Sequence, residues 1–152
     1  MKTNLIPLFL LILSTMPACQ TATPSPDVTA SVKKEFSLAP GQSAVVGETD
    51  LTITFHSIRN DERCPIEIEC VASGPVTISL SVLQGNDISS NVTLQTFTDN
   101  NGRSPKVEFE GIQDRLEVGE YLLRVVGVLP YPKNLSEIKA SDYRVTFTVA
   151  QK

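Results

Sequence analysis

The sequence predicts an all-β protein, an antiparallel immunoglobulin-like β-sandwich of about seven or eight strands. Three observations support this fold class. Apolar and polar residues alternate with a period of two over most of the chain, turn-forming residues recur at short intervals, and no segment has a convincing helical period. In residues 143–149, for example, Tyr, Val, Phe and Val alternate with Arg and two Thr. Such alternation is typical of strands with one buried face.

The expected strands follow one another along the chain, separated by turn signals such as PGQ, GETD, QGND, DNNG and VGE. One helical turn is expected within residues 134–142, with Asn134 or Ser136 as its cap. In the expected strand 76–82 the inward face is formed by Val76, Ile78, Leu80 and Val82. The six clearest segments are LTITFHS (51–57), VTISLSV (76–82), VTLQTF (92–97), KVEFEG (106–111), YLLRVVGV (121–128) and YRVTFTV (143–149).

The amino terminus has the features of an export signal. Lys2 precedes an apolar run at Leu5–Leu13, and nine helical residues span about 14 Å, well short of a hydrocarbon core of roughly 30 Å. A cleaved signal peptide is therefore favoured over a membrane-spanning helix. The following "STMPAC" resembles a bacterial lipobox, which predicts a lipoprotein signal peptide at 1–18 and lipidation of Cys19. The alternative is ordinary cleavage that leaves Cys19 free.

Cysteine number favours the lipid anchor, because lipidation of Cys19 removes the odd cysteine of an exported chain with three. Residues 19–31 are rich in Thr, Ser, Ala and Pro and are expected to form a flexible tether, with a single domain at 32–152. Two or three acyl chains hold a protein stably in a membrane. Gln20, rather than Asp, after the lipidated cysteine favours the outer membrane in a host with two membranes.

Charge excludes one class of partner. Removal of Lys2 with the signal peptide leaves 12 of the 13 basic residues against 17 acidic residues, a net charge of −5. No basic run is longer than Lys33-Lys34, so we expect no nucleic-acid binding. An acidic balance of this size mainly confers solubility and repulsion from anionic membrane surfaces.

The segment "DERCPIEIEC" holds the two remaining cysteines. Cys64 and Cys70 are expected to form a disulfide in an oxidising compartment, bracing the long connection between two strands. A loop of seven residues gives about 2.4 kcal/mol in the chain-entropy model. Thiol redox catalysis is disfavoured, because dithiol oxidoreductases use C-x-x-C and the neighbouring glutamates would raise a thiol pKa.

Other chemistry finds little support in the residue pattern. A structural zinc site takes four ligands, and His56 is the only histidine. His56 lies at an outward position of an expected strand, and Glu108 and Glu110 lie together on a solvated strand face. We therefore expect no catalytic residues, no metal and no cofactor. Weak calcium binding remains an alternative, although the acidic residues lack EF-hand spacing. These residues are Asp61, Glu62, Glu67 and Glu69.

Two parts of the chain resemble a family of small, uncharacterised bacterial lipoproteins. "DERCPIEIEC" followed by "VASG" is similar to their pattern D-x-R-C-P, four residues, Cys, then small residues and Gly, and "GEYLLRVVGVLPYP" with "DYRVTFTV" is similar in the carboxyl half. The resemblance covers about 51–149 and departs at residues 71–73, where an aromatic residue would precede the Gly. It implies a membrane-tethered β-sandwich and no known reaction. The matching residues are Asp61, Arg63, Cys64, Pro65, Cys70, Gly74, Pro130, Tyr131, Pro132, Asp142 and Tyr143.

These residues first predict structure. Pro65 prevents ladder pairing, Gly74 is expected to adopt a backbone conformation closed to other residues, and Arg63 is expected to pair with Asp61 or Asp142.

The function expected from all of this is that of a non-enzymatic, lipid-anchored extracytoplasmic module of the bacterial cell envelope. Its partners are the membrane, through the anchor, and an envelope protein or small ligand. The alternative is a protease inhibitor that presents Arg63-Cys64-Pro65 on a braced loop. The expected interaction loop comprises Asp61, Arg63, Pro65, Glu67 and Glu69.

Overall fold

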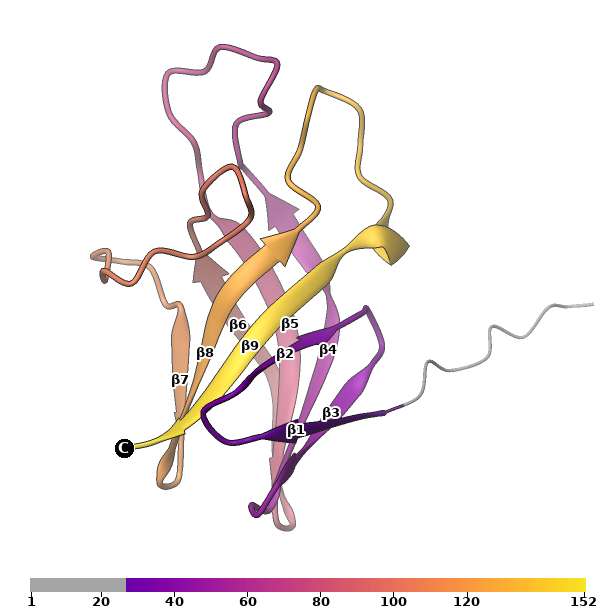
Figure 1. Ribbon diagram of the computed structural model, residues 1–152, viewed down its shortest axis with the longest axis vertical. Helices are drawn as coiled ribbons and strands as arrows, with labels where there is room; N and C mark the ends of the chain where they lie inside the picture. The colour runs from indigo at the N-terminus through magenta and orange to yellow at the C-terminus, as the bar shows by residue number, and fades with distance from the viewer. Residues whose placement is uncertain (1–26) are drawn as a thin grey trace, which may run out of the picture.

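The computed structural model describes residues 27–152, apart from the side chains of residues 88–91. The predicted signal peptide and Cys19 lie outside this range. The described chain forms nine strands and one 3₁₀ turn, arranged as two facing layers (Figure 1). In order they are β1 (Val28–Ser31), β2 (Glu35–Leu38), β3 (Ser43–Gly47), β4 (Leu51–Asp61), β5 (Val76–Gln84), β6 (Asp87–Thr96), β7 (Arg115–Val118), β8 (Tyr121–Leu129), η1 (Ala140–Asp142) and β9 (Arg144–Gln151).

The strands form a five-stranded sheet, in the order β1-β3-β4-β5-β6, and a four-stranded sheet, in the order β2-β9-β8-β7. The predicted all-β class is confirmed. The prediction of purely antiparallel sheets is wrong at one pair, because β1 runs parallel to β3. The chain passes from β1 to β2 in the other sheet before it returns as β3, and this detour allows two neighbours to point the same way. The immunoglobulin-like strand order stays a prediction.

The core lies between the two sheets and is formed by the inward residues of the alternating strands. The predicted inward face of β5 is confirmed, since all four of its residues are at most 1% exposed. Phe36 of β2 stacks on Phe147 of β9, with ring centroids 5.9 Å apart. Burying one large apolar side chain contributes about 1.5–3 kcal/mol, so this shared core is the main stabilising element.

The predicted strand at 106–111 is wrong. Residues 105–113 form no strand, and Val107 and Phe109 are 61% and 43% exposed. Phe109 packs edge-to-face on Phe97, with centroids 4.9 Å apart, instead of joining a sheet. Glu108 pairs with Arg115 at 2.5 Å. Local alternation is present here, but these residues form no ladder with any strand in the described part of the chain.

Two boundaries differ from the expected ones. Val28–Ser31, assigned to the end of the tether, form β1. The helical turn expected within 134–142 is present at its carboxyl end as η1. Asn134 does not cap η1, because its Oδ1 atom accepts a hydrogen bond from the Ser136 amide at 2.9 Å in a turn before it.

The connections between strands are unequal at the two ends of the molecule. Residues 62–75, 97–114 and 130–143 are long and meet at one end, which we call the loop end (Figure 1). The turns at residues 48–50, 85–86 and 119–120 are short and lie at the other end. Binding residues commonly occupy long loops that a rigid scaffold positions, so the loop end is where a site is expected.

Candidate functional site: a groove at the loop end

Residues from the two motifs, far apart in the sequence, meet at the loop end. Asp61 ends β4, Arg63 follows it, and Pro130 follows β8. The guanidinium of Arg63 lies between the carboxylate of Asp61 and the chain that leaves β8. Of the two partners expected for Arg63, the structure selects Asp61.

Arg63 is a buried charge, and its Nε, Nη1 and Nη2 groups all donate hydrogen bonds. Its side chain is 0% exposed, and that of Asp61 is 11% exposed. The Nε and Nη2 groups donate to the two Asp61 carboxylate oxygens at 2.8 and 2.6 Å. Nη1 donates to the carbonyl of Val128 at 2.9 Å, and Nη2 also donates to the carbonyl of Pro130 at 2.8 Å. The bidentate pair with Asp61 is local and holds the guanidinium in place, and the bonds to Val128 and Pro130 fix this segment against the end of β8.

Two tyrosines complete this network. The Tyr143 hydroxyl donates to Asp61 Oδ2 at 3.0 Å. The Tyr131 hydroxyl donates to the Cys64 carbonyl at 2.9 Å, and the Tyr131 ring lies 4.9 Å from the Arg63 guanidinium carbon. We call Asp61, Arg63, Tyr131 and Tyr143 the arginine network. It joins residues 62–75, which we call the cysteine loop, to both ends of the 130–143 connection.

Burial and hydrogen bonding oppose each other at Asp61. Burial raises the pKa of its carboxyl, but the hydrogen bonds and charge of Arg63, with the Tyr143 hydroxyl, outweigh burial and hold this pKa below the ordinary value of 3.8. The carboxyl is therefore ionised at neutral pH. The stability that this pair contributes is present above the ordinary pKa and is lost as the pH falls through the lowered one.

Tyr143 gives a testable pH dependence in the alkaline range. Burial, followed by the charge of Asp61 and the hydrogen bond to it, raises the pKa of Tyr143 from 10.0 to about 12. Between these values the unfolded chain loses a proton that the folded chain keeps, so stability falls as the pH rises. We expect Tyr143→Phe to lose about 1–2 kcal/mol at pH 7 through the missing hydrogen bond. This deficit should shrink between pH 10 and 12 in urea unfolding of both proteins; a deficit that stays constant would contradict the assignment.

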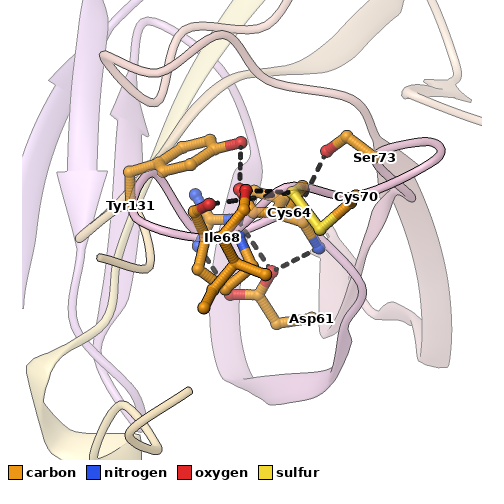
Figure 2. Close-up of a disulfide and its surroundings, with 8 residues drawn as sticks. Asp61, Cys64, Ile68, Cys70, Ser73 and Tyr131 are labelled. Atoms are coloured by element: carbon orange, nitrogen blue, oxygen red, sulfur yellow. Dashed lines mark hydrogen bonds and ion pairs between the residues drawn. A yellow bond between two sulfur atoms is a disulfide. The ribbon is translucent and has the colours of Figure 1, made fainter. Parts of the chain in front are cut away.

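The predicted disulfide is confirmed (Figure 2). Cys64 and Cys70 are joined with a Cα–Cα distance of 6.0 Å. The Cys64 amide donates to Ser73 Oγ at 3.0 Å. Within the braced loop, the Ile66 amide donates to the Pro132 carbonyl at 3.1 Å and the Glu67 amide donates to the Lys133 carbonyl at 2.8 Å. The disulfide and these two backbone bonds hold the cysteine loop against the 130–143 connection.

Gly74 is required for close approach rather than for its backbone angles. It is not among the glycines with positive φ, so the expected special conformation is wrong. A Cβ atom at this position would lie 2.5 Å from the Glu62 Cβ, well inside contact distance. The Gly74 amide donates to the Glu62 carbonyl at 2.8 Å, and this bond closes the base of the cysteine loop.

A groove of about 500 Å³ lies between the end of β4 and the 130–143 connection. Its volume is within the range of small-ligand pockets. The arginine network contributes to one wall through Asp61, Arg63 and Tyr143. The remaining lining residues are Ile58, Arg59, Asn60, Pro65, Pro132, Asn134, Leu135, Ser136, Glu137, Ile138 and Ala140.

The expected interaction loop divides into two parts. Asp61 and Arg63 are bound to each other and form the wall of the groove. Pro65 also lines the groove, whereas Glu67 and Glu69 are exposed and do not line it. Of the expected contact residues, only the two glutamates are therefore fully open to a partner.

Burial of Arg63 bears on the protease-inhibitor alternative. An inhibitory loop inserts an accessible side chain into the protease cleft, whereas the Arg63 side chain is 0% exposed. Insertion would first require the bonds to Asp61, Val128 and Pro130 to break. Nothing in this geometry favours the alternative.

The remaining candidates lie away from the groove. His56 is an exposed residue of β4 that shares a hydrogen bond of 3.0 Å with Ser81 Oγ, as expected of an outward strand position. Glu108 and Glu110 are exposed in the 97–114 connection. Among residues 27–152 no three His, Cys, Asp or Glu side chains are grouped so as to hold a metal ion. In the same range no helix has the length and apolar character needed to cross a membrane.

The two charged groove residues that the sequence analysis did not single out are Arg59 and Glu137. Arg59 has no partner residue in β5, because the register shifts between Ile58 and Asn60. The apolar residues Leu51, Ile53 and Phe55 change phase at Ile58, which indicates the first bulge of β4, at His56 between Phe55 and Ser57. No local pattern marks the second bulge at Arg59, and none marks Glu137.

Fold and site together define a class: an all-β, two-sheet domain with a disulfide-braced groove at one end. Comparison of the chain with family models, curated proteins and solved structures gave no match. The resemblance to small bacterial lipoproteins therefore stays a prediction.

Proposed function

We propose that this protein is a lipid-anchored, extracytoplasmic binding module of the bacterial cell envelope, without enzymatic activity, whose binding site is the loop-end groove. One observation carries the proposal. The arginine network is assembled from residues of both sequence motifs, and it holds two long loops around an open groove. A buried ion pair adds little net stability over apolar packing, so its use here is better explained by the need to fix the walls of a site.

The cysteine chemistry supports the extracytoplasmic location in this proposal. The Cys64–Cys70 disulfide favours an oxidising, extracytoplasmic environment. The apolar run supports an export signal, and the lipobox-like sequence supports a lipid anchor at Cys19. Gln20 after the anchored cysteine favours the outer membrane in a host with two membranes. The immunoglobulin-like relationship and membership of the small lipoprotein family belong to the same proposal.

The anchor can be tested by a single substitution. We expect Cys19→Ser to move the protein from the membrane fraction to the soluble extracytoplasmic fraction, because no acyl chain can then be attached. Immunoblots of fractionated cells give the measurement, with Cys64→Ser and Cys70→Ser together as the matched control that keeps Cys19. Retention of the Cys19→Ser protein in membranes would contradict lipid anchoring.

The groove can be tested in cells by crosslinking. A photoreactive amino acid at position 135, which lines the groove and is 82% exposed as Leu135, should give a specific crosslinked product. Ala140→Trp should abolish this product, because the indole fills the groove. The same photoreactive group at position 120, in the turn between β7 and β8 at the opposite end, is the control. Identical products from positions 135 and 120 would show that the groove is not the site.

A further inference from the structure

The groove has an open strand edge along one wall. β3 pairs with β4 only as far as Ser43 and Thr54, and the Phe55 bonds with Gln42 and Gly41 end this contact. From Ser57 to Asp61, β4 is paired with β5 on one side. On its other side no part of residues 27–152 forms backbone bonds with it. Edges of this kind accept an additional extended segment by main-chain hydrogen bonding.

A bulge alters the wall at the same place. Arg59 is the extra residue of β4 between Ile58 and Asn60 and has no partner residue in β5. Bulges bend a strand and redirect side chains, and they often occur beside functional sites. The four consecutive residues 58–61 consequently all line the groove, whereas strict alternation would turn every second side chain away from it.

Two opposite charges line this groove without neutralising each other. Arg59 lies on the β4 side and Glu137 lies on the 130–143 connection. Both are exposed, and neither side chain forms a hydrogen bond or ion pair with any residue in the range 27–152. Arg63 and Asp61, by contrast, are fully engaged with each other. The groove therefore offers one unpaired guanidinium and one unpaired carboxylate.

The apolar part of the lining lies among these charges. Ile58, Ile138 and Tyr143 contribute to it and are partly or fully buried. A ligand that matches the open strand edge, the two unpaired charges and the apolar lining has an extended backbone, a carboxylate, a cationic group and an apolar side chain. Three peptide residues reach about 10 Å when extended, a size that suits a groove of about 500 Å³.

We propose that the groove binds a short peptide with free termini, which adds to the open edge of β4. Its carboxylate pairs with Arg59, its ammonium group pairs with Glu137, and its apolar side chain contacts Ile58 and Ile138. A ligand with only one charge leaves the other groove charge unpaired, so zwitterionic peptides are selected. This inference deepens the proposed function and rests on it.

The probe is the tripeptide Ala-Leu-Ala, titrated into the purified mature protein and followed by ¹H–¹⁵N chemical shifts. The shifts of residues 57–61 and 134–140 should change. Blocking the peptide amine by acetylation or its carboxylate by amidation should each weaken binding about three- to tenfold. Arg59→Gln should remove the effect of amidation alone, and Glu137→Gln should remove the effect of acetylation alone. The matched controls, Lys106→Gln and Glu120→Gln, should change neither.

The contrary results are equally specific. The proposal fails if free and blocked peptides bind alike, if the shifts fall outside the groove, or if Arg59→Gln preserves the carboxylate preference. It also fails if vesicles of phosphatidylethanolamine bind through the groove while the tripeptide does not. The crosslink at position 135 distinguishes failure of the peptide-ligand proposal from failure of the groove as the binding site. Loss of peptide binding with the crosslink retained overturns only the ligand class, whereas loss of both overturns the groove as a site.

Discussion

Replacing Arg63 with Ala is expected to lower the free energy of unfolding by about 3–5 kcal/mol, because removal of one partner of a buried ion pair leaves the other charge uncompensated. The Asp61 carboxylate would keep only the Tyr143 hydroxyl and local contacts, and the carbonyls of Val128 and Pro130 would lose their donor. Urea unfolding at pH 7 gives the measurement. A loss of this size is a large share of the typical stability of about 5–15 kcal/mol.

Two further substitutions make this result interpretable. Arg63→Lys should recover only part of the loss, because an ammonium group cannot form the two parallel bonds to Asp61. Arg103→Ala removes an exposed pair with Glu35, in which the side chains are 52% and 49% exposed. It should cost less than about 1 kcal/mol. If the free energy of unfolding of the Arg63→Ala variant is within 1 kcal/mol of the wild-type value, the arginine network does not hold the loops together.

Replacement of both Cys64 and Cys70 by Ser is expected to lower the melting temperature by roughly 10 °C. The entropy of closing a seven-residue loop corresponds to about 2.4 kcal/mol, and a domain of this size shifts by about 4 °C per kcal/mol. The strand content should be retained, because the disulfide lies outside both sheets. Circular dichroism measures both quantities.

Reduction offers an independent control for the same bond. The wild-type protein in dithiothreitol should melt close to the double variant, and the reductant should leave the double variant unchanged. Equal melting temperatures for the oxidised wild type and the double variant would rule out the disulfide as a brace. In that case the two backbone bonds from Ile66 and Glu67 to the 130–143 connection would suffice to order the cysteine loop.

The fold was predictable where alternation coincided with pairing. Residues 76–82 and 143–149 alternate and are buried on the expected face, because each is paired on both sides within its sheet. Residues 106–111 alternate equally well, but alternation does not specify a partner strand, and these residues lie in a loop. β1 was missed for the opposite reason. Its sequence, VTAS, has only four residues, two of them polar, and Ala30 is its only buried residue.

The site was predictable in part. The cysteine spacing and the compartment sufficed for the disulfide, since two neighbouring thiols in an oxidising environment pair. The burial of Arg63 was not predictable, because arginine is almost never fully buried unless it is paired, and its acceptors at Val128 and Pro130 are distant in sequence. The phase change from Phe55 to Ile58 marked the first bulge of β4, at His56, but not the second bulge at Arg59, which follows Ile58.

The parallel pairing of β1 with β3 has a mechanical consequence. If the protein is held at its amino terminus, tension from the anchor reaches the domain through β1, whose four residues are paired with residues 44–47 of β3. Loss of these pairs would release about 13 Å of extended chain. Ala30 would leave the core and Val28 would lose its packing against it, while the groove at the loop end would keep its walls. We expect β1 to detach from β3 first under a pulling force, and the released chain to relieve the tension before the ligand site is deformed.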